Sequence, residues 1–92
     1  MDERQLQRQL LLQAVKERRG QPQKICEVAI AELIRRDMFV YEKDELVLQI
    51  RRRFSRFKTT AEVYLKLGIL AGMYQNNPEE FLLEFEIQIL EG

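Results

Sequence analysis

Signals that begin and end helices recur at short intervals along the chain, and they restrict the possible folds more than any other feature. A first helix is predicted from about Glu3 to Arg19, because Gly20 and then Pro22 follow its apolar stripe in the order typical of a helix end. A second is predicted from Pro22 to about Asp37, with apolar residues at i, i+3, i+4 and i+7. Its core-facing stripe is Cys26, Ala29, Ile30 and Leu33.

Two further start signals lie in the second half of the chain. Thr59 and Glu62 have the spacing of a capping box, in which the threonine oxygen accepts a hydrogen bond from the glutamate amide. The helix that follows is predicted to reach about Gln75. Asn77 and Pro78 then start the last helix, because Asn is a favoured cap and Pro fits the first helical position.

Between these two pairs of helices, Asp44 is predicted to cap a third helix. A chain of 92 residues supports one domain rather than two. We therefore predict an all-α fold, a compact bundle of about five short antiparallel helices that forms a single domain over residues 1–92. The apolar stripe of the third helix is Leu46, Val47, Ile50, Phe54 and Phe57.

A strand interpretation stays open at two places. The segment "LEFEIQI" (83–89) alternates strictly between apolar and polar residues, and "MFVYEKDELVLQI" (38–50) could form a hairpin that turns between Glu42 and Glu45. Together they would give a three-stranded sheet and an α+β, winged-helix type of domain. Against this stand the helix start just before the first segment and the lack of Gly or Asn in the turn.

Composition excludes several classes of function. The 15 basic and 15 acidic residues cancel, there is no histidine, and Cys26 is the single cysteine, so neither a disulfide within the chain nor a zinc site is expected. No nucleotide-binding loop or nucleophile motif occurs, and we expect a protein that is not an enzyme and needs no cofactor. No apolar run is long enough for a bilayer, and the charged N-terminus is unlike an export signal, so a cytoplasmic location is expected.

The densest charge lies in "IRRRFSRFK" (50–58), with five cations in nine residues. On a helix these cations would lie opposite or beside the apolar stripe, so the segment fits a solvated face. It also fits a site for an anion, either an acidic protein surface such as the glutamate-rich end of this chain or a nucleic acid. The candidate anion-binding or partner-binding residues are Arg51, Arg52, Arg53, Arg56 and Lys58.

The helix after Thr59 is apolar most of the way round, which predicts burial on most of its sides. Ala61, Gly68 and Gly72 share one strip of it. Because glycine in a helix interior costs about 1 kcal/mol relative to alanine, the strip predicts the close approach of a neighbouring backbone.

The last helix has two apolar faces, more than one small domain is expected to bury. One face consists of Phe81, Leu82, Phe85 and Ile89, and the other of Leu83, Ile87 and Leu90. Leu48, on the back of the predicted third helix, is a similar excess apolar residue. We predict that Leu83, Ile87, Leu90 and Leu48 bind a partner.

The segment "AEVYLKLGILAGMYQNNPEEFLLEF" and the rest of the chain to Leu90 (residues 61–90) resemble one tetratricopeptide-type helical hairpin. Tyr64, Leu67 and Gly68 stand where that repeat has its aromatic, Leu and Gly, although Phe81 replaces a small residue. The resemblance implies binding to helices or extended peptides, as in small assembly and secretion chaperones.

Taken with the two-faced last helix, the resemblance leads us to expect a non-enzymatic interaction module, such as an adaptor, chaperone or small regulator. Its expected partner is another protein or a second copy of the chain, and neither a membrane nor a small-molecule substrate. The alternative is a nucleic-acid-binding transcriptional regulator that uses the basic segment.

Overall fold

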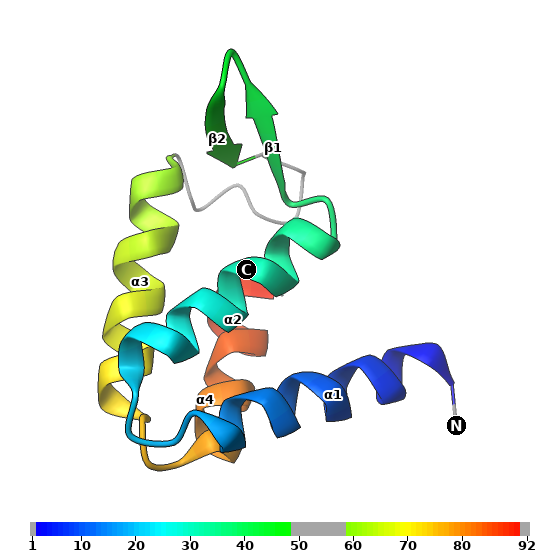
Figure 1. Cartoon of the computed structure of the whole chain (residues 1–92), viewed down its shortest axis with the longest axis vertical. Coiled ribbons are helices and arrows are strands. Elements are labelled where there is room, and N and C mark those ends of the chain that lie inside the picture. Colours follow the sequence, from blue (N-terminus) through cyan, green and yellow to red (C-terminus); the bar gives the residue numbers. More distant parts are fainter. Residues whose placement is uncertain (1, 49–58, 91–92) are drawn as a thin grey trace.

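The computed structural model describes residues 2–48 and 59–90 of the chain (Figure 1). The C-terminal part of the predicted third helix and the basic residues Arg51, Arg52, Arg53, Arg56 and Lys58 lie outside the described residues. The described elements are α1 (Glu3–Glu17), α2 (Pro22–Arg35), β1 (Phe39–Glu42), β2 (Glu45–Leu48), α3 (Thr60–Met73), α4 (Pro78–Phe85) and the π-helical turn η2 (Glu86–Leu90).

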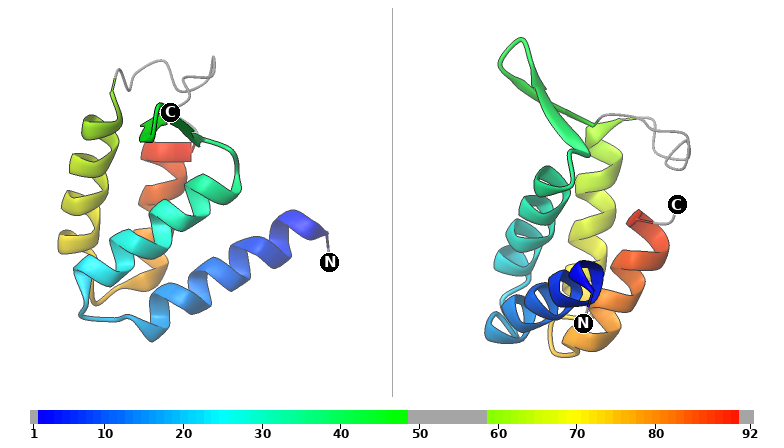
Figure 2. Two further views of the ribbon diagram at one scale, coloured as in Figure 1. Left: turned by 45° about the horizontal axis from the view of Figure 1, so that its top comes forward. Right: turned by 90° about the vertical axis from the view of Figure 1, so that its right-hand side faces the viewer.

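Each of the four described α-helices packs against two others. The helices α1 and α3 each contact both α2 and α4, and η2 continues α4. The α1–α2 turn and the α3–α4 turn meet at one end of the molecule, where the Gly20 N–H donates to the Gln75 carbonyl oxygen at 2.8 Å. The β1–β2 hairpin projects from the opposite end, as Figures 1 and 2 show.

The core is apolar and draws on both strands and all the described helices. Within residues 2–48 and 59–90, no polar or charged side chain is buried. The rings of Phe81 and Phe85, four residues apart on α4, stack with their centroids 6.1 Å apart. The largest fully buried side chains are Phe81, Phe85, Ile25, Leu33, Leu67, Leu70, Leu82, Ile89, Val15 and Val63.

Two of the predicted helix starts, at Thr59 and Asn77, are confirmed at atomic detail. The Oγ1 of Thr59 accepts a hydrogen bond from the Glu62 N–H at 3.2 Å, and the Oδ1 of Asn77 accepts one from the Glu80 N–H at 3.3 Å. Pro78 is the first residue of α4, where its missing N–H costs nothing. At the start of α1, Asp2 fills the same capping role by accepting from the Gln5 N–H at 2.8 Å.

The helix α2 ends in a Schellman motif. Asp37 adopts the left-handed conformation with φ 58°, and the next N–H, that of Met38, donates to the Leu33 carbonyl oxygen at 2.9 Å. Met38 and Leu33 are both buried, which adds the apolar contact that usually accompanies this motif. The chain therefore leaves α2 in a fixed direction, toward the hairpin.

The predicted third helix, capped by Asp44, is wrong for residues 39–48, which form the hairpin given as the alternative. Glu42 pairs with Glu45, and the two turn residues between them, Lys43 and Asp44, both have positive φ, 51° and 66°. This is the backbone of a type I′ turn, which normally takes Asn or Gly. Asp tolerates the left-handed region. Phe39 and Leu48, the strand residues farthest from the turn, are buried, and their burial offsets the strain at Lys43.

The other strand interpretation is not borne out. The segment 83–89 is helical, spanning the end of α4 and most of η2, and its predicted inner face of Phe81, Leu82, Phe85 and Ile89 is buried. In the described part of the chain the sheet has two strands, not three. The all-α prediction is thus corrected to a mostly helical fold, with four α-helices and a two-stranded hairpin among the described residues.

Candidate functional site

One side of α3 is buried and the opposite side is uncovered. The buried residues Val63, Leu67, Leu70 and Ala71 face α2 and α4. On the other side, the side chains of Leu65, Ile69 and Met73 are 68%, 47% and 65% exposed. The prediction that this helix is buried on most of its sides is thus not met by residues 2–48 and 59–90.

The glycines of α3 lie on the uncovered side as well. A Cβ built on Gly68 or on Gly72 would meet no atom of the described neighbours within 4 Å. The neighbouring backbone that these glycines predicted is absent from the described part of this chain. We name the uncharged part of this uncovered surface the α3 outer face, made up of Ala61, Leu65, Gly68, Ile69, Gly72 and Met73; the exposed Glu62 lies beside it at the start of the helix.

The outer face has a defined relief. Leu65, Ile69 and Met73 are spaced four residues apart and form a ridge along the helix. Gly68 and Gly72 form a furrow beside that ridge, because neither carries a side chain. We use ridge and furrow in this sense below.

Charge on α3 is confined to its N-terminal half. Glu62 and Lys66 are the two charged residues in the helix sequence, and none occurs from Leu67 to Met73. In Figures 1 and 2, α3 forms one edge of the molecule, with α2 and α4 on its inner side. The outer face is therefore an apolar, nearly uncharged surface on the rim of the fold.

Tyr64 connects this face to the hairpin. Its ring lies 5.9 Å from that of Phe39, centroid to centroid and tilted by 33°. Phe39 is buried while Tyr64 is more than one-third exposed. A hydrogen bond also joins the start of α3 to the hairpin: the Oγ1 of Thr60 accepts from the Leu48 N–H at 2.6 Å.

Leu48 itself is placed differently from the prediction. It ends β2 and is 6% exposed, so it belongs to the core and not to the back of a helix. Of the other predicted partner-binding residues, Leu83 and Ile87 are 44% and 46% exposed, whereas Leu90 is partly buried against the core. The structure thus leaves two of these four side chains well exposed to a partner.

Two glutamates of the last helix contact α1. Glu86 accepts from Arg8, with the Nη2 and Oε1 atoms 2.9 Å apart, and Lys16 lies 3.6 Å from Glu79. Both pairs are largely solvent-exposed and contribute about 0.2–1 kcal/mol each. One alternative for the basic segment was pairing with the glutamate-rich end of the chain, and two of those glutamates pair with α1 in the structure.

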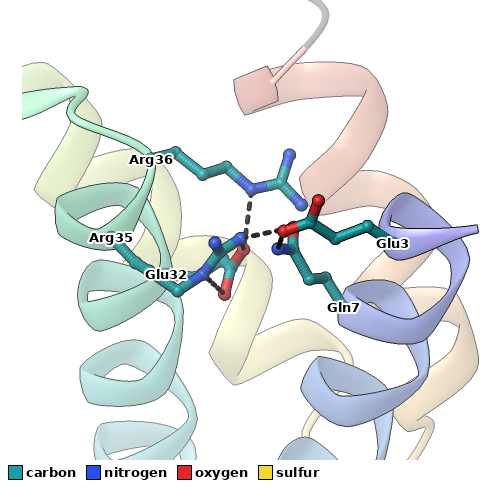
Figure 3. Close-up of polar contacts among 5 residues, drawn as sticks. All are labelled: Glu3, Gln7, Glu32, Arg35 and Arg36. Atoms are coloured by element: carbon teal, nitrogen blue, oxygen red, sulfur yellow. Dashed lines mark hydrogen bonds and ion pairs between the residues drawn. The ribbon is translucent and has the colours of Figure 1, made fainter.

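A polar cluster joins α1 to α2 (Figure 3). Arg35 donates both to Glu32 and, at 2.9 Å, to the Oε1 of Gln7, while Arg36 donates to Glu32 at 2.7 Å. Gln7 in turn donates to Glu3 at 3.2 Å. Burial raises the pKa of Glu32, but hydrogen bonds from the two arginines outweigh it and lower the pKa below its usual value.

Next to this cluster, α1 and α2 enclose a groove of about 420 Å³. Its floor is apolar and its rim polar, and Leu10 on α1 is well exposed. On the rim, Arg35 donates hydrogen bonds to both Gln7 and Glu32, so the groove offers few polar groups that could bind a ligand. The remaining lining residues are Leu10, Leu11, Ala14, Val28 and Ala31.

The described residues hold little that resembles a reactive centre. Cys26 is half-buried on α2, where burial and then the nearby charge of Glu27 raise the pKa of its thiol and keep it protonated. In residues 2–48 and 59–90, no three acidic, cysteine or histidine side chains are placed to hold a metal ion. Over the same residues, no helix combines the length and apolar character that crossing a bilayer would require.

Comparison with models of protein families, with curated proteins and with solved structures gives no match to this chain.

Proposed function

We propose that this protein is a non-enzymatic interaction module that binds an apolar helical surface through the α3 outer face. The observation that carries the proposal is the exposure of Leu65, Ile69 and Met73 beside the uncovered Gly68 and Gly72. Isolated exposed apolar residues are ordinary, but contiguous apolar patches on soluble proteins are typical of binding sites.

The form of this patch favours a helix as the bound element. An amphipathic helix binds through apolar residues at i, i+3, i+4 and i+7, and a surface of matching relief accepts it. The furrow at Gly68 and Gly72 allows a helix backbone to come close, and the ridge supplies the apolar contact area. The resemblance to a tetratricopeptide-type hairpin, a fold that binds helices and peptides, points in the same direction.

Leu83 and Ile87 offer a smaller second surface on α4 and η2. Glu80 and Glu84 lie on the same helix, so this surface would favour a partner with positive charge. The nucleic-acid alternative depends on the basic residues outside the described part of the chain, and it stays a prediction.

The test is affinity capture from cell extract with the tagged chain and with a Leu65→Gln, Ile69→Gln variant. We expect the tagged chain to retain a protein, either a copy of itself or a different chain, that the variant does not retain. A Leu6→Gln, Leu10→Gln variant is the matched control, because it removes two leucines of similar exposure from a different helix, α1. Equal retention by the chain and the α3 variant, or no retention at all, contradicts the proposal.

A further inference from the structure

We propose that the partner of the α3 outer face is a second copy of this chain, bound through the same face about a two-fold axis. The inference rests on the function proposed above and names its partner. Two-fold interfaces use the same patch on both copies, so the patch must be complementary to itself in shape and in charge. The α3 outer face meets both requirements.

The first requirement is shape. Rows of residues spaced four apart on one helix pack into the furrows of another, with the helix axes crossing at about −50°. On α3 the ridge of Leu65, Ile69 and Met73 lies directly beside the furrow of Gly68 and Gly72. A two-fold axis therefore places the ridge of each copy in the furrow of the other. Since no atom of the described neighbours lies within 4 Å of a Cβ built at either glycine, the furrow has room for that ridge.

The second requirement is charge. Identical charges that meet across a two-fold axis repel. The helix sequence from Leu67 to Met73 carries none, and the two charges in the N-terminal half of the helix, Glu62 and Lys66, have opposite signs. The whole chain has a formal net charge of zero, so two copies are not held apart by long-range repulsion. A strongly charged partner, by contrast, would find no opposite charge along this part of the face.

The size of the face sets the expected affinity. The three ridge side chains expose on the order of 100 Å² of apolar surface each, or roughly 300 Å² per copy. Specific interfaces usually bury about 800 Å² per partner, and smaller ones are weak or transient. We therefore expect a weak, transient dimer with a Kd of roughly 100 μM, which forms in concentrated solution and separates on dilution.

Sedimentation equilibrium between roughly 1 and 500 μM tests the inference. The mass should rise with concentration from the 11.0 kDa of one chain toward twice that value. Gly68→Leu with Gly72→Leu, which fills the furrow, and Leu65→Gln with Ile69→Gln, which removes most of the ridge, should each raise the Kd by at least about tenfold. The matched control, Leu6→Gln with Leu10→Gln on α1, should dimerise like the unmodified chain.

Circular dichroism of dilute samples verifies that each variant keeps its helices. The substituted side chains point away from the core, so folding should be retained. Should the glycine variant unfold, the ridge variant alone decides the question, because its two side chains are already exposed.

A single-chain mass at every concentration overturns the inference. So does a dimer that the α1 control disrupts and the α3 variants leave intact. The proposed function fails separately, when capture from extract does not depend on the α3 outer face. A monomer that captures a different protein through α3 therefore contradicts the second copy and leaves the function standing.

Discussion

Gly68→Ala should stabilise the isolated chain. Gly68 lies in the interior of α3, where alanine is favoured over glycine by about 0.8–1.0 kcal/mol. A Cβ there would meet none of the described neighbours within 4 Å, so no steric cost is subtracted from this gain. The net expectation is an increase of about 1 kcal/mol in the free energy of unfolding.

The same substitution at Gly72 should have a smaller effect. Gly72 is followed by Met73, the last residue of α3, and helix propensity counts for less near a helix end, so we expect about 0.5 kcal/mol. For a domain of this size, 1 kcal/mol corresponds to a change in Tm of about 4–8 °C. Gly68→Ala alone should therefore raise the Tm by about that amount.

Thermal and urea denaturation followed by circular dichroism measure both effects. The samples must be dilute enough to keep the chain monomeric, because the new Cβ would enter the furrow and weaken the dimer. The gain should accordingly shrink in concentrated samples. An unchanged or lower Tm in dilute solution would refute the reasoning, since it would mean that a neighbouring element of the same chain occupies the space beside Gly68.

The remaining predictions concern two strained turns and one ion cluster. Asp37→Gly should stabilise the fold by about 0.5–1 kcal/mol in urea denaturation, because glycine adopts positive φ without strain; a loss would show that the aspartate has another role there. Lys43→Asn with Asp44→Gly should add about 1 kcal/mol, since Asn-Gly suits a type I′ turn, and unchanged stability would argue against this turn type. Glu32→Gln should cost about 1–2 kcal/mol at pH 7, where the carboxylate accepts from its arginine partners. Because the pKa of Glu32 is lowered in the fold, its contribution is present above the unfolded value of about 4.3 and is lost as the pH falls through the folded pKa. The difference in stability between the two proteins should therefore shrink as the pH falls below about 4.3, and a difference that stays constant there would contradict this assignment.

The helix starts could be predicted because their signals are local. A cap needs one side chain and a backbone N–H two or three residues away, as at Thr59 and Asn77, and no distant contact decides whether it forms. The buried face of α4 could be predicted equally well, because the spacing of its phenylalanines and the proline at its start both indicate a helix. Such agreement between local signals makes a prediction reliable.

The hairpin was not predictable with the same security. Its turn residues, Lys43 and Asp44, are poor choices for positive φ when taken alone, and its strands are only four residues long. The strands form because Phe39 and Leu48, at their far ends, are buried against the helices. Tertiary burial thus overrides a weak turn, and this is information that periodicity does not carry.

The exposed side of α3 marks a different limit. A helix that is apolar most of the way round predicts neighbours on most sides, but the sequence does not say whether those neighbours belong to the same chain. Here the described elements cover one side only, so Leu65 and Met73 remain exposed. The pattern predicted a covered surface, and the residues that the structure describes leave that surface open.

The most direct test of the α3 outer face as the surface through which two copies of this chain associate is a concentration series of amide NMR spectra. Amide shifts of Leu65, Gly68, Ile69 and Gly72 should move together as the chain is concentrated, while those around Leu83 and Ile87 stay constant. Spectra that do not change with concentration, or changes that centre on α1 or α4 instead, would contradict the account.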